Sequence, residues 1–298
     1  MKITNKYNLP EALIAAISND KYDGGHGDIS VTSLIAPVQQ RRLGLKHWDA
    51  LEEDASERIY ALLGSSVHHV LQLAGEKLQE DGRDIITEKR FYHKIGGKNL
   101  SAQIDLYENR NLYDFKVTSV YAMKSAIEEG KDEWTAQLNI QAYLMEMNGH
   151  AVDELNITAI ARDWNKHLAK RDPKMPPKAC NIPITLWEFE ATEKYILDRL
   201  EAHFGEETPE CTPEECWERP TTYALMKKGR VSAVKVEATE QDLMNYAEAK
   251  SAVFLNEEAD WEFTGGHYIE VRQGERVRCD DYCSSAPFCD QYKKWKQK

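Results

Sequence analysis

The sequence predicts a mixed α/β protein built around a small sheet. Three short runs rich in Phe, Tyr, Ile, Leu and Val lie between residues 86 and 118, and two turn signals at 96–99 and 108–111 separate them. This pattern is typical of a three-stranded antiparallel meander. Apolar residues at helical spacing precede and follow the meander, so helices are expected beside the sheet.

The elements before and within the meander follow from their periodicity. From Asp54 the chain enters a helix whose apolar positions are Val67, Val70, Leu71, Ala74 and Leu78. The segment Gly64-Ser65-Ser66-Val67-His68 stands at the start of that apolar run. We expect the three strands at about 86–95, 100–107 and 111–118.

A second helix is predicted after the meander. Leu138, Ala142 and Met145 form its core stripe, Gly149 ends it, and Gln137 and Gln141 lie one turn apart beside the stripe. Further along we expect a buried strand at 154–162, a basic loop at 166–177, a strand at 184–189 and an amphipathic helix at 191–204.

Charged residues of the meander are expected to converge at one end of the sheet. Because side chains alternate along a strand, Asp114 and Lys116 share a face, while Asp105 ends the neighbouring strand and Glu88 opens the first. Carboxylates in this arrangement suit Mg2+ or Mn2+. The plain alternative is that these charges are the solvated face of a strand.

The order of these residues adds weight to the metal hypothesis. G-x-x-x-H at Gly64–His68 is followed by Glu88, Asp105, D-x-K at 114–116 and Gln137 on a helix. This order resembles the PD-(D/E)xK nuclease superfamily, and within it the RecB-like branch that includes CRISPR-associated and bacteriophage exonucleases. The resemblance is specific over about 57–160. It implies a restriction-endonuclease-like core, with the strand at 154–162 beside the D-x-K strand.

The resemblance also implies roles for single residues. Asp105 and Asp114 would be the principal metal ligands, Lys116 would position or activate water, and Gln137 would contact substrate or orient the site. His68, Glu88 and the main-chain carbonyl of Phe115 would be supporting ligands. The branch usually has Tyr four residues after the glutamine, whereas this chain has Gln141 there and Tyr143 two residues later. Gln137, Gln141 and Tyr143 are therefore the DNA contacts expected on this helix.

Composition limits the class of protein. The chain has 298 residues, 42% hydrophobic content and a formal net charge of −12, which argues against a general basic coat for nucleic acid. A local cluster at Lys227, Lys228 and Arg230 is the candidate contact with DNA phosphates. No apolar run reaches the length of a membrane span and the N-terminus lacks a secretory pattern, so we expect no membrane partner and a cytoplasmic location. The resemblance implies that this is the cytoplasm of a bacterial cell or phage-infected host.

Five of the six cysteines lie after residue 205. Cys279, Cys283 and Cys289 are compactly spaced, and Cys180, Cys211 and Cys216 are the candidates for a fourth thiolate. Because disulfides are rare in the cytoplasm, the clustering suggests metal. The related exonucleases often carry a [4Fe-4S] cluster on three C-terminal cysteines and one distant cysteine. By that resemblance we assign Cys211 as the fourth ligand. Structural Zn2+ and unliganded thiols are the alternatives.

We therefore predict a Mg2+- or Mn2+-dependent DNA exonuclease, with single-stranded DNA ends as substrate by resemblance, acting in recombination, repair or phage DNA metabolism. The expected organisation is an N-terminal helical cap at 1–53, the nuclease core at 54–205 and a cysteine-bearing extension packed on the core at 206–298. The alternatives are a structure-specific endonuclease and a weakly catalytic DNA-binding partner of a recombination or CRISPR machine. The oligomeric state does not follow from the sequence.

Overall fold

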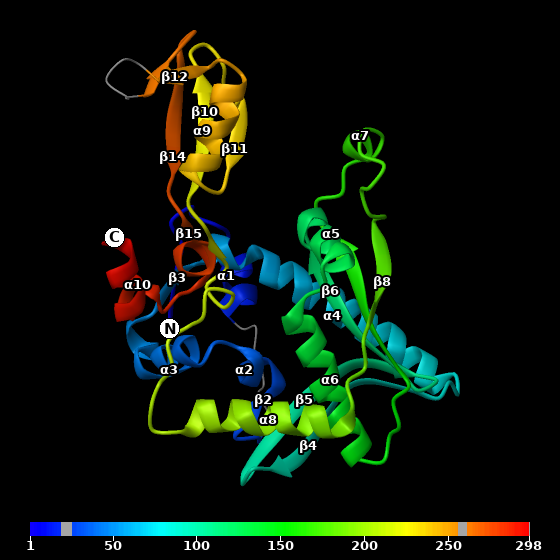
Figure 1. Cartoon of the computed structure of the whole chain (residues 1–298). Helices are drawn as coiled ribbons and strands as arrows, with labels where there is room; N and C mark the ends of the chain where they lie inside the picture. The colour runs from blue at the N-terminus through cyan, green and yellow to red at the C-terminus, as the bar shows by residue number, and fades with distance from the viewer. Residues whose placement is uncertain (19–25, 256–260, 298) are drawn as a thin grey trace. The chain divides into compact units, whose positions relative to one another are not determined.

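The computed structural model describes residues 1–18, 26–255 and 261–297, and the chain forms two compact units, Met1–Pro209 and Glu210–Lys298. Residues 19–25 of the predicted cap, and 256–260 and 298 of the predicted extension, lie outside the described residues. The fold is mixed α/β (Figure 1). Among the described residues, no helix combines the length and apolar character that a membrane span requires.

A six-stranded sheet organises the first unit. Its strands run in the order β2-β5-β6-β7-β8, and β4 pairs with β5. The bounds are β2 Ile29–Ser30, β4 Ile85–Ile95, β5 Lys98–Glu108, β6 Asn111–Thr118, β7 Glu154–Ala161 and β8 Ala179–Ile184. A separate short pair joins β1 Lys2–Thr4 to β3 Glu52–Asp54.

The predicted antiparallel meander is present as β4, β5 and β6. Each of its turns has two central residues with positive φ: 55° and 75° at Gly96 and Gly97, and 51° and 64° at Asn109 and Arg110. Two positive φ values in succession are the geometry of a tight hairpin turn that matches strand twist, and glycine and asparagine tolerate it best. Turn chemistry therefore fixed both strand boundaries.

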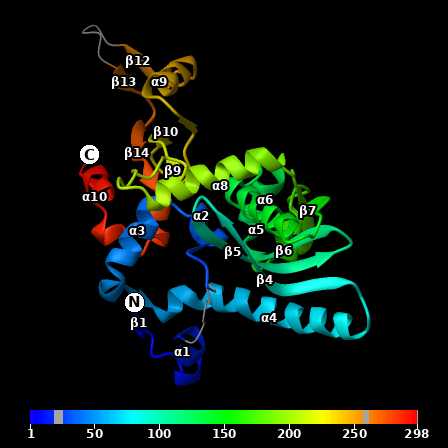
Figure 2. The same cartoon turned by 90° about the horizontal axis from the view of Figure 1, so that it is seen from below.

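Helices cover both faces of this sheet, as Figure 2 shows for α4 and α6 on either side of β4 and β5. The helices of the unit are α1 Glu11–Ser18, α2 Val31–Ile35, α3 Val38–Lys46, α4 Ile59–Glu80, α5 Val120–Glu128, α6 Asp132–Met147, α7 Lys166–Ala169 and α8 Phe189–Phe204. The predicted helix around Gln137 is α6, and Gly149, with φ 85°, follows its end. α6 is buried almost all round because it contacts both the sheet and α8.

The connection between β6 and β7 passes through α5 and α6, and the two strands are parallel. The predicted strand at 154–162 is thus β7, beside the strand that carries Asp114 and Lys116. The predicted strand at 184–189 is wrong. The last strand is β8, which ends at Ile184, and α8 begins at Phe189. Pro183 lies within β8, an edge strand, where its missing N–H is tolerated.

The hydrophobic core of the first unit draws on residues from both halves of the unit. Leu34, Leu100, Ile104, Leu138 and Ile157 are among its fully buried members. Residues 1–53, predicted as a cap, lie within this unit, and β2 and α2 contribute Ile29, Val31 and Leu34 to the same core.

The second unit contains a three-stranded sheet with α9 packed against it. The bounds are β9 Glu218–Arg219, β10 Thr222–Lys227, β11 Lys235–Glu237, α9 Glu240–Ala249, β12 Val253–Leu255, β13 Trp261–Phe263, β14 His267–Arg272, β15 Glu275–Arg276 and α10 Asp290–Lys296. The sheet order is β11-β10-β14, and Leu225, Leu243 and Ala247 lie in its small core.

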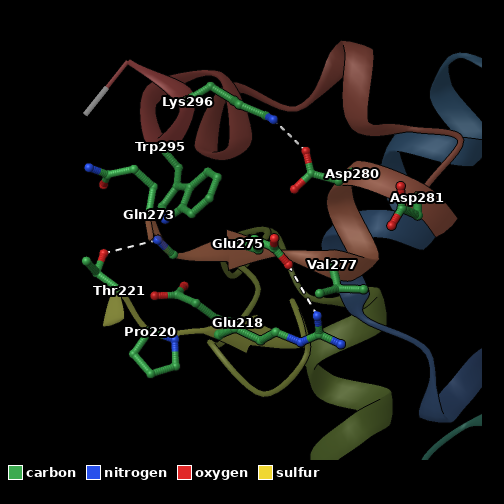
Figure 3. Close-up of a pocket in the computed structure, with 12 residues that line it drawn as sticks. Glu218, Pro220, Thr221, Gln273, Glu275, Val277, Asp280, Asp281, Trp295 and Lys296 are labelled. Carbon is green, nitrogen blue, oxygen red and sulfur yellow. Dashed lines mark hydrogen bonds and ion pairs between the residues drawn. The ribbon is translucent and has the colours of Figure 1, made fainter. Parts of the chain in front are cut away.

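A cavity of about 710 Å³ opens within the second unit beside Trp295 (Figure 3). Several carboxylates line it, and each of three faces a cation. Glu275 pairs with Arg219 at 3.3 Å, Glu218 pairs with Arg276 at 2.8 Å, and Asp280 pairs with Lys296 at 2.5 Å. The charges of these three carboxylates are therefore compensated by basic side chains of the same unit.

Candidate metal centre

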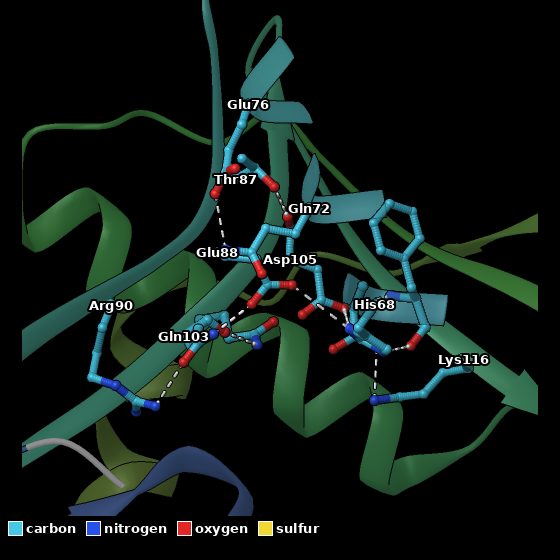
Figure 4. Close-up of polar contacts among 12 residues, drawn as sticks. His68, Gln72, Glu76, Thr87, Glu88, Arg90, Gln103, Asp105 and Lys116 are labelled. Atoms are coloured by element: carbon cyan, nitrogen blue, oxygen red, sulfur yellow. Dashed lines mark hydrogen bonds and ion pairs between the residues drawn. The ribbon is translucent and has the colours of Figure 1, made fainter. Parts of the chain in front are cut away.

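Three groups with metal-binding chemistry meet in the first unit. One ligand atom each from His68, Glu88 and Asp105 lies within 4.8 Å of the others. Nδ1 of His68 is 3.5 Å from Oδ2 of Asp105 and 3.8 Å from Oε1 of Glu88 (Figure 4). Among the described residues this is the one group of three or more His, Cys, Asp or Glu side chains that is close enough to share an ion.

The two carboxylates lie where the strand pairing is interrupted. The β4–β5 ladder pairs Thr87 with Leu106 and Lys89 with Ile104, and skips the Glu88–Asp105 position between them. The β5–β6 pairing includes only residues 106–108 of β5, so Asp105 is the first residue of β5 beyond it. Where two paired strands separate, side chains become accessible that regular pairing would direct to one face of the sheet or the other. The site is thus a product of the sheet topology.

Helix α4 brings His68 to this point. Nε2 of His68 lies 3.0 Å from the carbonyl oxygen of Phe115, which can only accept, so in the neutral imidazole Nε2 carries the proton. Nδ1 is then the free lone pair, and it faces the two carboxylates. The Phe115 carbonyl, expected as a supporting metal ligand, is in contact with His68 and fixes its ring orientation.

The absence of a side chain at Gly75 permits α4 to approach β4 closely. A Cβ at Gly75 would lie 2.9 Å from Oγ1 and 3.0 Å from Cβ of Thr87, and Gly75 is the one buried residue of α4. The Thr87 hydroxyl in turn donates to the main-chain oxygen of Asp105, 3.0 Å away. The helix therefore packs directly on the strand that carries Glu88.

Glu88 itself has unusual backbone geometry. Its φ is 49°, in the left-handed region, and it is the one non-glycine residue of the described chain with positive φ inside a strand. Such a conformation costs about 1–3 kcal/mol and persists only where surrounding structure enforces it. Strain of this kind clusters at functional sites.

Asp114, Lys116 and Gln137 form a second group in the same pocket. Nζ of Lys116 is 2.7 Å from Oδ2 of Asp114 and 3.1 Å from Oε1 of Gln137, and Nε2 of Gln137 donates to Oδ1 of Asp114 at 2.6 Å. Gln137 thus orients the aspartate and the lysine. The carboxylate of Asp114, expected as a principal metal ligand, is engaged by these two side chains and is not in the group around His68.

Burial and neighbouring charges shift the pKa values of three side chains in the site. Burial, followed by the Asp114 carboxylate, raises the pKa of Asp105 to about 7. Contact with the Glu88 carboxylate raises the pKa of His68, against the effect of burial. Burial alone would lower the pKa of Lys116, but the Asp114 carboxylate more than offsets it and the net pKa is raised. A cation would offset the cost of ionising the buried Asp105.

One pocket of about 590 Å³ is lined by both groups of site residues and by Gln141. The two groups are His68, Glu88 and Asp105, and Asp114, Lys116 and Gln137. Gln141 is buried and donates from Nε2 to the main-chain oxygen of Gln103 at 3.2 Å. The predicted DNA contact of Tyr143 is not supported, because its side chain is buried away from the pocket. Its hydroxyl lies 3.1 Å from Glu193 and its ring stacks on Phe189.

The sequence interpretation missed two polar neighbours of Glu88. Nε2 of Gln103 donates to Oε2 of Glu88, and Arg90 donates to Oε1 of Gln103 at 2.8 Å. Arg90 is two residues from Glu88, and Gln103 is two residues from Asp105. The alternation of side chains along a strand, which placed Asp114 with Lys116, is the signal that would have identified both.

The cysteines of the second unit influence one another electrostatically. Burial, followed by the neighbouring Cys216 thiol, raises the pKa of both Cys211 and Cys279 to about 12. Cys283 and Cys289 also act on Cys279. Cys216, which the resemblance left aside, is buried next to Cys279. Cys180 lies on β8 of the first unit.

The predicted basic cluster lies on an exposed turn of the second unit. Lys227 ends β10, and Lys228 and Arg230 follow in the turn toward β11, all three exposed. The turn is closed by a hydrogen bond from the Arg230 amide to the Lys227 carbonyl oxygen at 3.0 Å.

Comparison with known proteins adds little to this geometry. No family model and no curated protein matches the chain. Among solved structures, the chain is similar to the crystal structure of SSO0001, with 18% sequence identity and a TM-score of 0.42 over 69% of this chain and 87% of that chain.

Proposed function

We propose that this chain is a divalent-metal-dependent nuclease that hydrolyses phosphodiester bonds of DNA, with a restriction-endonuclease-like core in its first unit. The observation that carries the proposal is the meeting of His68, Glu88 and Asp105 within 4.8 Å of one another, in a pocket that also holds Asp114 and Lys116.

The donor set fits a divalent cation. It offers one imidazole nitrogen and two carboxylates, a combination that suits Mn2+ and, through its oxygens, Mg2+. Asp105 is nearly fully buried, and its raised pKa reflects a charge that needs compensation. A cation held there would supply Lewis-acid polarisation of a phosphodiester and lower the pKa of water beside it.

The side chains of this protein then account for orientation and proton handling. Gln137 holds Asp114 and Lys116 in fixed positions, so the ammonium group is preorganised to orient a water or to offset charge on a phosphate oxygen. His68 is oriented through the Phe115 carbonyl, so Nδ1 stays directed at the Glu88 and Asp105 carboxylates, with which it would hold the ion. Preorganisation of this kind stabilises a transition state without movement at the moment of reaction.

The second unit supports the proposal in two ways. The exposed turn at Lys227, Lys228 and Arg230 offers three cations to a DNA backbone despite the acidic total charge. The compact spacing of Cys279, Cys283 and Cys289 in the sequence, with Cys211 or Cys216 as a fourth thiolate, supports a [4Fe-4S] cluster.

The resemblance favours an iron-sulfur cluster over one zinc ion, because the related exonucleases often carry a [4Fe-4S] cluster on three C-terminal cysteines and one distant cysteine. Structural Zn2+ on four thiolates is the alternative.

The proposal is tested with labelled single-stranded, double-stranded and circular DNA, in Mg2+ or Mn2+ and in chelator. We expect cation-dependent cleavage, and a loss of at least about a thousandfold, or roughly 4 kcal/mol, for Asp105→Asn and Asp114→Asn. Asp172→Asn is the matched control, because Asp172 pairs with Lys124 outside the pocket.

The DNA form that is cleaved separates the alternatives. Cleavage confined to free ends indicates an exonuclease, and cleavage of circles indicates an endonuclease. Binding of DNA with no cleavage under any cation would leave a DNA-binding partner as the function. Near wild-type cleavage by folded Asp105→Asn protein would remove the metal centre from the mechanism.

A further inference from the structure

The strained backbone at Glu88 needs a local cause. A glutamate at φ 49° inside β4 departs from extended strand geometry, and nothing in the residue type favours this conformation. The Glu88 side chain is only 14% exposed, so it is held against protein atoms. The contacts of its two oxygens show what holds it.

Each oxygen of Glu88 has a different partner. Oε1 lies 3.8 Å from Nδ1 of His68, and Oε2 accepts a hydrogen bond from Nε2 of Gln103. This division leaves Oε1 directed toward His68 in the candidate metal centre, while Oε2 is occupied by the Gln103 amide. Figure 4 shows the row of side chains from Arg90 through Gln103 and Glu88 to His68.

Arg90 determines which way the Gln103 amide faces. Its guanidinium can only donate, and it donates to Oε1 of Gln103 at 2.8 Å. The NH2 group of Gln103 must therefore face Glu88, where it matches the carboxylate acceptor. The Gln103 backbone is tied in turn to α6, through the donation from Gln141 to its carbonyl oxygen.

We propose that Gln103, oriented by Arg90, is a positioning residue that holds Glu88 in the geometry needed to ligate the metal ion. The inference rests on the proposed function, because it assumes that His68, Glu88 and Asp105 hold a divalent cation. Gln103 has an exposed, uncharged side chain, and in this inference it acts on the metal ion only by positioning Glu88.

The test measures Mn2+ binding rather than DNA cleavage. Purified protein, stripped with chelator, is titrated with Mn2+, and the free ion is followed by electron paramagnetic resonance. Gln103→Ala is expected to weaken Mn2+ binding about tenfold or more, the usual effect of losing a partner of a metal ligand. Arg90→Ala is expected to weaken it in the same direction and by less.

A matched control lies in the same pocket. Gln72 also lines the pocket, but its amide donates to Glu76 at 2.9 Å and not to Glu88. Gln72→Ala should therefore bind Mn2+ like the wild type. In a Glu88→Ala background, Gln103→Ala should cause no further loss, because its effect passes through Glu88.

The outcomes separate this inference from the proposed function. If the wild type binds Mn2+ and Gln103→Ala binds it equally well, the positioning role is overturned and the metal centre stands. An equal loss on Gln103→Ala with and without Glu88 would also overturn it, since a general structural effect would then explain the loss. If the wild type takes up no Mn2+, both ideas fall. Should Gln103→Ala fail to fold, unchanged binding by Arg90→Ala overturns the role.

Discussion

At the scale of single residues, the Asp114–Lys116 pair is the most tightly constrained part of the site. Asp114 is 2% exposed, Lys116 neutralises it at 2.7 Å, and Gln137 contacts both. A buried carboxylate is tolerated only while its charge and its hydrogen bonds are satisfied. The preorganisation that the proposed function requires and the stability of the first unit thus depend on the same three side chains.

Removing the lysine should therefore cost stability as well as activity. Without divalent cations, Lys116→Ala is expected to lower the free energy of unfolding by about 3 kcal/mol, because the buried Asp114 side chain loses its ion-pair partner. Asp114→Asn in the same background should recover much of that loss. Urea denaturation of the four proteins of this double-mutant cycle measures the coupling, and additive losses would mean that the pair is not a stability element.

At the scale of elements, the approach of α4 to β4 decides where His68 lies. Gly75 is in contact with Thr87, and the Thr87 hydroxyl is tied to the backbone of Asp105, so one close contact links the helix to both strands of the site. Gly64, in the same helix, has open space where a Cβ would be. The two glycines therefore have different physical roles despite their shared helix.

Alanine at these two positions should give opposite results. Gly75→Ala forces α4 from β4 and is expected to destabilise the protein by about 1–3 kcal/mol, as overpacking does. Gly64→Ala should stabilise it by up to about 1 kcal/mol, because alanine is the better helix former. Chemical denaturation of both variants checks this. Equal effects of one sign would show that the Gly75–Thr87 contact does not limit the helix position.

At the scale of the whole molecule, the chain has two units with different means of stabilisation. The first has a large core that joins the sheet to α6 and α8, whereas the second has a small core around α9 and a cysteine-bearing end from Arg278 to Cys289. A chain end with few buried apolar residues gains order when its thiolates bind metal. The bound group would then act as a folding element of the second unit.

Loss of one cysteine should affect the second unit and leave the candidate metal centre of the first unit unchanged. Cys283→Ser is expected to lose the brown colour and visible absorbance of anaerobically purified protein, and to lower its melting temperature, while Mn2+ binding at the His68 site persists. Cys180→Ser, in the first unit, is the control and should stay coloured. Comparison of Cys211→Ser with Cys216→Ser identifies the fourth ligand.

Other results would redefine this region. Colourless protein with stoichiometric zinc would replace the cluster by a structural zinc site. Metal-free protein with an unchanged melting temperature would leave reduced, unliganded thiols. Both results would leave the carboxylate site of the first unit untouched.

Local sequence patterns are sufficient to predict the meander, the helices around His68 and Gln137, and the strand beside Asp114. Hairpin turns and periodic apolar faces are local, so residues close in the chain specify them. The resemblance carried by the order of the motif residues placed His68, Glu88, Asp105 and Asp114 at one metal site, and of these the structure groups His68, Glu88 and Asp105. The local patterns misplaced the strand after residue 177, where Pro183 and a short edge strand weaken the local signal.

The way in which the site residues divide their contacts depends on the folded arrangement of strands and helices. The ladder interruption at Glu88 and Asp105, the pairing of Asp114 with Lys116 and Gln137, and the burial of Tyr143 depend on which strands part and which helix face meets the sheet. The Gln103–Glu88 contact depends likewise on the register of β4 against β5. These are contacts between residues distant in the chain, and local patterns carry no information about their register or distance.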